Sequence, residues 1–184
     1  MIEVIMKDNI IEVAWAAEDV AIIKIVGRGS FQNSLDLRNA SSNIQGKNPR
    51  VKLIIDLNDC IAMDSTFMGT LAEISTGQNC RGHGYLTVVN AKDHTHELLA
   101  NLGLKYILDM REPSSSEMVK EEDFQVVDKP AKTPKFEQIV HMINAHKTLI
   151  NVDNKNQVIF QSVIKYLEDS LEREKKKQAE DDSR

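Results

Sequence analysis

The residues Asp64, Ser65 and Thr66 stand where one hydrophobic pattern ends and another begins. Residues 60–63 form a short apolar patch, and after Thr66 the apolar side chains recur three and four positions apart, which is typical of a helix with one buried face. The oxygens of Ser, Thr and Asp cap helices because they accept hydrogen bonds from N–H groups that the first turn leaves unpaired. A hydroxyl at this place is therefore either a cap or a reactive site.

A role for Ser65 as a catalytic nucleophile has little support from its neighbours. Its strand-to-helix position is similar to a nucleophile elbow, but that strained turn needs Gly two residues before and two residues after the Ser. Met63 and Phe67 occupy those positions. The sequence identifies no base for a catalytic triad either. We therefore expect a protein that is not an enzyme and needs no cofactor.

The histidines do not form a recognisable metal motif. The densest group is His94-Thr95-His96-Glu97, and residues two apart on a helix point in different directions. His141 and His146 are five apart and are also splayed, so we expect them at solvated positions of a helix. The sequence predicts no metal site.

Composition describes an ordinary globular chain of 184 residues with 41% hydrophobic content and a net charge of −5. The charge is spread over the whole chain, so no basic region favours nucleic acid as a partner. Apolar runs are far shorter than the roughly 20 residues of a membrane helix, and the start lacks a signal-peptide cleavage site. We expect a cytoplasmic protein without membrane association. Cys60 and Cys80 have no CxxC partner and are expected to be reduced, buried thiols.

Strand and helix patterns alternate through the first part of the chain, which favours an α/β domain over residues 1–110. Ile, Val and Trp dominate two neighbouring strands that should form a hairpin, and Gly27 after them suits a turn with positive φ. Strands are predicted at residues 10–17, 20–26, 51–57, 85–89 and 106–108, and helices at 34–44, 65–79 and 91–102.

After residue 110 the sequence predicts a linker, a helical hairpin and a tail. Residues 111–133 are rich in Pro, Ser and charge and are predicted to be a linker, with a small ordered piece at 124–127. Residues 134–177 predict a helical hairpin, and residues 178–184 a solvated, disordered tail. The apolar face of the hairpin must pack on the α/β domain, on a second copy or on a partner. Its expected buried positions are Phe136, Ile139, Val140, Ile143, Ile159, Phe160, Val163, Ile164, Leu167 and Leu171.

The segment around Ser65 resembles the STAS family, the anti-sigma factor antagonists. That family has an apolar strand ending in Asp, a short strand, then Asp-Ser-Ser/Thr-Gly-Leu-Gly and a helix. The matching elements are Leu53-Ile54-Ile55-Asp56-Leu57, Ile61-Ala62-Met63 and Asp64-Ser65-Thr66-Phe67-Met68-Gly69 with Leu71. The closing helix and Gly-Leu turn of the family match Leu98, Leu99, Leu102-Gly103-Leu104 and Tyr106-Ile107. The resemblance covers residues 10 to 110.

The resemblance implies a STAS-like mixed β-sheet with helices packed mainly on one face, to which this chain adds a C-terminal α-helical hairpin. It also implies a bacterial regulatory module that binds proteins and acts by partner switching in transcription regulation. In that family the Ser after the signature Asp is phosphorylated by an anti-sigma factor that is itself a serine kinase, and a metal-dependent serine phosphatase reverses this. The implied phosphorylation site is Ser65, with Thr66 as a minor candidate.

Two departures from the family pattern lie close to the implied switch. Phe67 stands where the family usually has Gly, which changes the surface beside Ser65. Ser30 lies near the place where the family often carries an acidic residue.

A phosphate at Ser65 adds about −1.5 to −2 charges, which a helix N-terminus tolerates. A partner docked there has to desolvate this charge beside Asp64 and is released. The implied partner-binding residues are Asp64, Ser65, Thr66, Phe67 and Met68, with Phe67 as an apolar anchor if it is exposed. The alternative is a scaffold without phosphorylation, in which Ser65 caps its helix and the C-terminal helices form a homodimer or another assembly.

Overall fold

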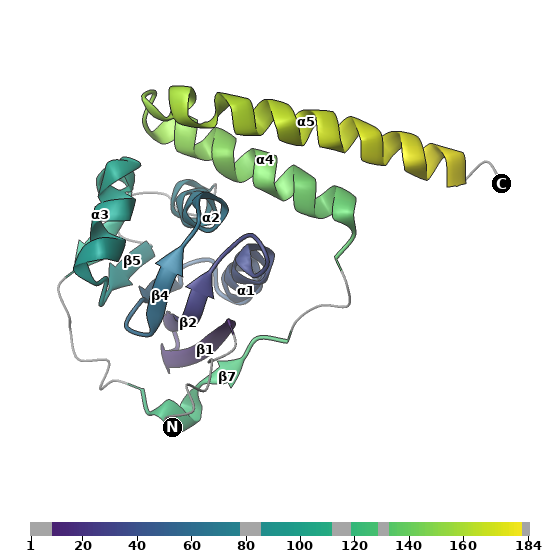
Figure 1. The fold of residues 1–184 in the computed structure, drawn as a ribbon. Coiled ribbons are helices and arrows are strands. Elements are labelled where there is room, and N and C mark those ends of the chain that lie inside the picture. Colours follow the sequence, from purple (N-terminus) through teal and green to yellow (C-terminus); the bar gives the residue numbers. More distant parts are fainter. Residues whose placement is uncertain (1–8, 78–85, 112–118, 129–132, 182–184) are drawn as a thin grey trace, which may run out of the picture.

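A β-sheet, a layer of helices on it and an outer helical hairpin follow one another in the structure (Figure 1). The structure is a computed structural model and describes residues 9–77, 86–111, 119–128 and 133–181. Asn79, Cys80, His83 and Tyr85 lie outside these ranges, so the predicted state of Cys80 and the predicted ends of two elements are not described. Cys60 is buried with a free thiol.

The described residues form a mixed sheet of seven strands in the order β6-β5-β3-β2-β1-β7, with β4 paired to β2. β1 runs antiparallel to both β2 and β7, and the other pairs are parallel. The strands are β1 (Ile10–Ala17), β2 (Val20–Gly29), β3 (Lys52–Asp56), β4 (Cys60–Met63), β5 (Leu86–Val89), β6 (Asp109–Arg111) and β7 (Gln125–Val126). This mixed sheet confirms the predicted fold class.

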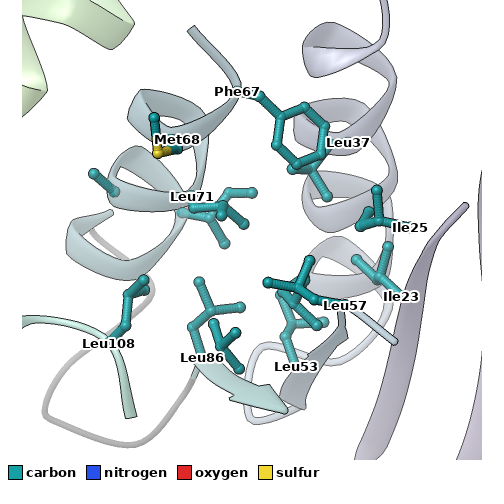
Figure 2. Packing of buried hydrophobic residues seen from close by; sticks show 14 of the residues in the cluster. Ile23, Ile25, Leu37, Leu53, Leu57, Phe67, Met68, Leu71, Leu86 and Leu108 are labelled. Atoms are coloured by element: carbon teal, nitrogen blue, oxygen red, sulfur yellow. The ribbon is translucent and has the colours of Figure 1, made fainter. Parts of the chain in front are cut away.

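Parallel neighbours need helical crossovers, and three helices supply them. These are α1 (Ser34–Lys47), α2 (Ser65–Thr76) and α3 (Asp93–Asn101). The hairpin consists of α4 (Lys135–Val152) and α5 (Asn156–Asp181), and it lies outside α1 and α2 (Figure 1). The main core lies between the sheet and the inner helices, where Ile23, Ile25, Leu37, Leu53 and Leu71 are fully buried (Figure 2).

The strand predicted at residues 106–108 is wrong. Gly103 adopts a left-handed φ of 80° and ends α3, and a 3-10 turn, η1 (Leu104–Tyr106), follows it. This turn buries Leu104, and the strand begins only at Asp109, which pairs with Thr87. The apolar residues that suggested a strand therefore belong to a turn, which is anchored in the core by Leu104 and precedes the strand.

The predicted ordered piece at residues 124–127 is confirmed, because β7 joins the free edge of β1 there. A 3-10 turn, η3 (Glu121–Asp123), precedes β7. The ammonium of Lys24 lies 2.7 Å from Glu121 and 3.3 Å from Asp59, and Lys24 is itself buried. This paired charge ties the residues before the hairpin to the sheet.

The hairpin packs on the α/β part of its own chain, through α4 against α2. α5 remains helical to Asp181, although a disordered tail was predicted from residue 178, because Lys, Gln, Ala and Glu favour helix. Phe160 and Leu167 of α5 are buried as predicted. Ile159 and Val163 were predicted to be buried and are exposed.

The buried ring of Phe67 depends on a glycine in the neighbouring strand. Phe67 is 0% exposed and packs beside Leu37 (Figure 2). A Cβ atom on Gly29 would lie 2.6 Å from the Phe67 Cδ1 atom, which is closer than non-bonded carbons approach. The bulky residue that departs from the family pattern is thus accommodated inside the core.

We predict that Gly29→Ala lowers the free energy of unfolding by about 1–3 kcal/mol, because the core there has no free volume. Urea denaturation measures the change. The matched control is Gly46→Ala, since a Cβ on Gly46 meets nothing within 4 Å and Ala favours helix. The loss should shrink when Phe67→Leu is present as well. Equal losses in both backgrounds would show that the two residues do not share this space.

Candidate functional site

The side chain of Asp64 organises the start of α2. It is the N-cap residue, and its Oδ1 atom accepts from the Phe67 N–H at 2.9 Å. Its Oδ2 atom accepts from the Phe31 N–H at 2.8 Å, which fixes the loop between β2 and α1. The prediction that Ser65 caps this helix is therefore wrong, because Asp64 does so and Ser65 is the first helical residue.

The hydroxyl of Ser65 bonds to the C-terminal hairpin. Its Oγ lies 2.9 Å from Nε2 of His146, a residue of α4. The other ring nitrogen, Nδ1, lies 2.7 Å from the Met142 carbonyl oxygen, which can only accept. In the neutral imidazole Nδ1 therefore carries the proton, and the Ser65 hydroxyl donates to Nε2.

The Ser65–His146 pair lacks other features of a hydrolytic site. Its imidazole is oriented by the Met142 carbonyl instead of a carboxylate, and His146 is only 4% exposed. The ring of Phe160 packs edge-on against it at a centroid distance of 5.0 Å. The pair is a partly buried contact between two helices, in which His146 itself is buried.

A second histidine of α4 enters the layer between α1 and α2. Nε2 of His141 lies 3.1 Å from the Thr70 hydroxyl and 3.0 Å from the Ser34 hydroxyl. Both hydroxyls donate elsewhere, to the carbonyls of Thr66 and Phe31, so they accept from the ring. Nε2 therefore carries the proton.

The remaining nitrogen of His141 faces a carboxyl group. Nδ1 lies 4.0 Å from Oε2 of Glu73, too far for a hydrogen bond. Both Nδ1 and the other oxygen of Glu73, Oε1, are buried without a partner. Burial raises the pKa of Glu73 to about 7, and burial together with the charge of Arg38 lowers the pKa of His141 to about 4. A docked α4 thus places two poorly solvated titratable groups side by side.

The five residues proposed for partner binding have different environments. Asp64 and Ser65 are half-buried at the start of α2. Thr66, Phe67 and Met68 are buried, so the expectation of Phe67 as a surface anchor is not met. The Phe67 ring points into the core beside Leu37 (Figure 2), and it lies against Gly29 of β2.

The histidines of α4 were predicted to be solvated, and that prediction is wrong. His141 is 1% exposed, and His94 and His96 of α3 are the exposed ones. A signal existed in the sequence, because His146 continues the helical spacing of Ile139 and Ile143. The partner of His146 has no such signal, since Ser65 lies 81 residues away in the chain.

An open hollow adjoins Asp64 on the side away from the hairpin contact. Its volume is ≈ 320 Å³, and Phe31, Ala62, Met63 and Asp64 contribute to its walls. Phe31 is 47% exposed and is held in place by its N–H bond to Asp64. Phe31 is therefore an exposed aromatic group close to the start of α2.

Comparison with known families decides the class of this domain. The STAS domain model matches residues 14–117. The chain belongs to the STAS domain family. Helices α4 and α5 lie outside the matched residues, so the hairpin that contacts Ser65 is additional to the STAS domain. A comparison with curated proteins gave no match.

One solved structure supports the STAS fold, and two others show weaker similarity. The unphosphorylated form of the anti-sigma factor antagonist SpoIIAA is 15% identical, with a TM-score of 0.50 over 58% of this chain and 90% of that one. The phosphorylated form of the Bacillus protein is 14% identical, with a TM-score of 0.46 over 58% and 94%. A protein assigned as an anti-sigma factor antagonist from Thermotoga maritima is 18% identical, with a TM-score of 0.46 over 56% and 87%.

Among the residues that the structure describes, none belongs to a helix long and apolar enough to cross a membrane.

We predict opposite pH dependences for variants of the buried Glu73–His141 pair. Neutral Glu73 stabilises the fold below its ordinary pKa of 4.5, and this contribution is lost as the pH rises through about 7. Neutral His141 stabilises the fold above its ordinary pKa of 6.5, and this contribution is lost as the pH falls towards about 4. Relative to the wild type, Glu73→Gln should therefore become more stable as the pH rises. His141→Gln should become more stable than the wild type as the pH falls.

Urea denaturation at several pH values between 4 and 8 measures these slopes. The double variant Glu73→Gln/His141→Gln is the control, because it removes both titrations. Arg38 is the other charged group facing the pair, and it is unchanged in all the variants. If the difference in unfolding free energy from the wild type changed with pH in the same direction for both single variants, the result would contradict this account.

Proposed function

We propose that this protein is a cytoplasmic, non-enzymatic anti-sigma factor antagonist whose partner binding is switched by reversible phosphorylation of Ser65. A serine kinase of the anti-sigma type transfers the terminal phosphoryl group of ATP to Oγ. The O–P bond forms, the bond to ADP breaks and the hydroxyl proton leaves. A serine phosphatase hydrolyses the ester, and Thr66 is a minor candidate for the same modification.

The position of Ser65 is the observation that carries this proposal. Asp64 fixes the start of α2 at the end of β4, so Ser65 stands at the first helical residue directly after the signature Asp. The positive end of the α2 dipole accepts added negative charge without loss of the fold. Thr66 is buried and its carbonyl is bonded to Thr70, which makes Ser65 the better substrate.

The partner surface in this proposal is centred on Asp64, Ser65 and Phe31. Exposed aromatic side chains next to polar groups are typical interface anchors. Phe31 takes the anchoring role that Phe67 and Met68 cannot fill while they are buried. A structure of SpoIIAA exists in the phosphorylated form, and phosphorylation of Ser65 is proposed here by analogy.

One observation favours the alternative, a scaffold that is not phosphorylated. The Ser65 hydroxyl is already engaged by His146, so Ser65 has a structural role in the described conformation. In that alternative the hairpin stays docked, and the exposed face of α5 serves assembly.

The first test is phosphorylation of the full chain by the serine kinases of its own genome. We predict that one of them modifies Ser65, mapped by mass spectrometry, and that Ser65→Ala abolishes the modification. Absence of phosphate on Ser65 and Thr66 with every kinase would exclude the switch and leave the scaffold.

The same assay tests the partner surface, and Phe31→Ala belongs to this first prediction. Loss of an anchor should slow phosphorylation of Ser65 about tenfold or more without changing thermal stability. The matched control is Trp15→Ala, which removes an aromatic group of similar exposure, 41% against 47%, from β1. Equal effects of the two variants would show that Phe31 is not part of the kinase contact.

We also propose that the C-terminal helices form a homodimer through the exposed face of α5. Val158, Ile159, Val163 and Tyr166 are exposed there, and burying such side chains drives association. Light scattering of the full chain should give twice the monomer mass of 20.8 kDa, and Tyr166→Lys should return the monomer. Tyr106→Lys is the control, because Tyr106 is equally exposed at 66% but lies on η1. A monomeric wild type would disprove the dimer.

A further inference from the structure

We infer that the α4–α5 hairpin is an intramolecular cover of Ser65, which must lift before Ser65 is phosphorylated and which phosphorylation then holds open. This inference rests on the proposed function, because it concerns the regulation of the same site. The cover lies outside the matched STAS residues, so it is a device that this chain adds to the domain.

In the docked hairpin His146 occupies the position next to the hydroxyl of Ser65. Oγ of Ser65 is at hydrogen-bond distance from His146 Nε2, and phosphorylation places a phosphorus with three oxygens on that same atom. The His146 ring is held from two other sides, by the Met142 carbonyl at Nδ1 and by the Phe160 ring. The ring therefore cannot swing aside while α4 keeps its place.

The backbones of α2 and α4 are already in contact. Gly69 on the next turn of α2 lies directly against the backbone of α4, because a Cβ on Gly69 would lie 2.5 Å from the Ala145 carbonyl oxygen. Such close contact between helices requires small residues at the crossing, and Ala145 is fully buried there. Room for a phosphoryl group therefore comes from movement of α4 away from α2, which breaks this contact.

The hairpin has the means to lift as a unit. Ile139, Ile143 and Leu167 form a second apolar cluster between α4 and α5, separate from the main core. At the hairpin turn, beside the end of α4 that carries His146, Asn156 donates to the carbonyls of Leu102 and Leu149 and holds the turn to the domain. The hairpin thus keeps its own core when α4 moves away from Ser65, and this movement also breaks the contacts at the turn.

The interface that opens contains two buried polar atoms that gain from exposure to water. It contains the buried, unpartnered atoms Nδ1 of His141 and Oε1 of Glu73, and these atoms regain water when α4 leaves. A phosphate on Ser65 also adds like charge beside the Asp64 carboxylate, and a buried dianion there is strongly unfavourable. By linkage, whatever lifts the cover promotes phosphorylation, and phosphorylation promotes the lifted state to the same extent.

The first test needs no kinase. Phosphoserine is incorporated at position 65 of the full chain during translation, and hydrogen–deuterium exchange is compared with the unmodified chain. The amides of α4 should exchange about tenfold faster or more, while β2 and β3 keep their protection. Unchanged or stronger protection of α4 would overturn the inference, because it would mean that His146 binds the phosphate in the docked state.

The second test lifts the cover without phosphate. Gly69→Ala places a methyl group against Ala145 and should raise exchange in α4, although Ala is the better helix residue for α2. Gly46→Ala is the matched control and should leave α4 protected, since nothing lies within 4 Å of its new Cβ. Ala145→Leu makes the same wedge from the hairpin side and leaves the STAS domain unaltered. Protection of α4 that survives both wedges would contradict the docking contact.

The kinase assay then tests whether lifting of the hairpin raises the rate of phosphorylation of Ser65. Ser65 in Gly69→Ala should be phosphorylated about tenfold faster than in Gly46→Ala, since the hydroxyl is freed. Equal rates with a lifted hairpin would overturn the gating role. If no kinase modifies any variant, the proposed function fails, whereas the exchange experiment with phosphoserine still decides whether the hairpin and a phosphate exclude each other.

Discussion

The hydrogen bonds of Asp64 determine the geometry around Ser65. The backbone N–H of Asp64 donates to the Gly29 carbonyl at the end of β2. The two carboxylate oxygens accept from the Phe67 N–H in α2 and from the Phe31 N–H in the loop between β2 and α1. One side chain thus joins three chain segments at the end of the sheet. Because an N-cap fixes where a helix begins, Ser65 has one defined position and direction.

Most of the fold follows from local patterns. The alternation in β1, the buried run of β2 and the helical spacing after Asp64 were sufficient to predict an α/β domain with a terminal helical hairpin. The mixed sheet was implied by the resemblance to the STAS family. The errors arose where tertiary contact decides. Phe67 turns inward because residue 29 lacks a side chain, and Tyr106 belongs to a 3-10 turn because Gly103 ends α3 with positive φ.

The site was predictable only in part, for the same reason. Asp64 and Ser65 are marked by their own sequence context, whereas His146 reaches Ser65 only after the hairpin docks. A histidine on a helix is usually solvated, and its spacing relative to Ile139 and Ile143 was the one local sign of burial. Docking itself is set by Gly69 and Ala145, two small residues that carry no strong signal in isolation.

The hairpin contacts the domain in two chemically different ways, by apolar burial near its turn and by hydrogen bonds to α2. Leu149 and Phe160 join the main core and anchor the hairpin near its turn by apolar burial. The contact with α2 instead relies on hydrogen bonds of His146 and His141 and on the close approach at Gly69. Hydrogen bonds add little net stability when water replaces them, but they demand one geometry. A charged group at Ser65 therefore meets the part of the interface whose hydrogen bonds define its geometry.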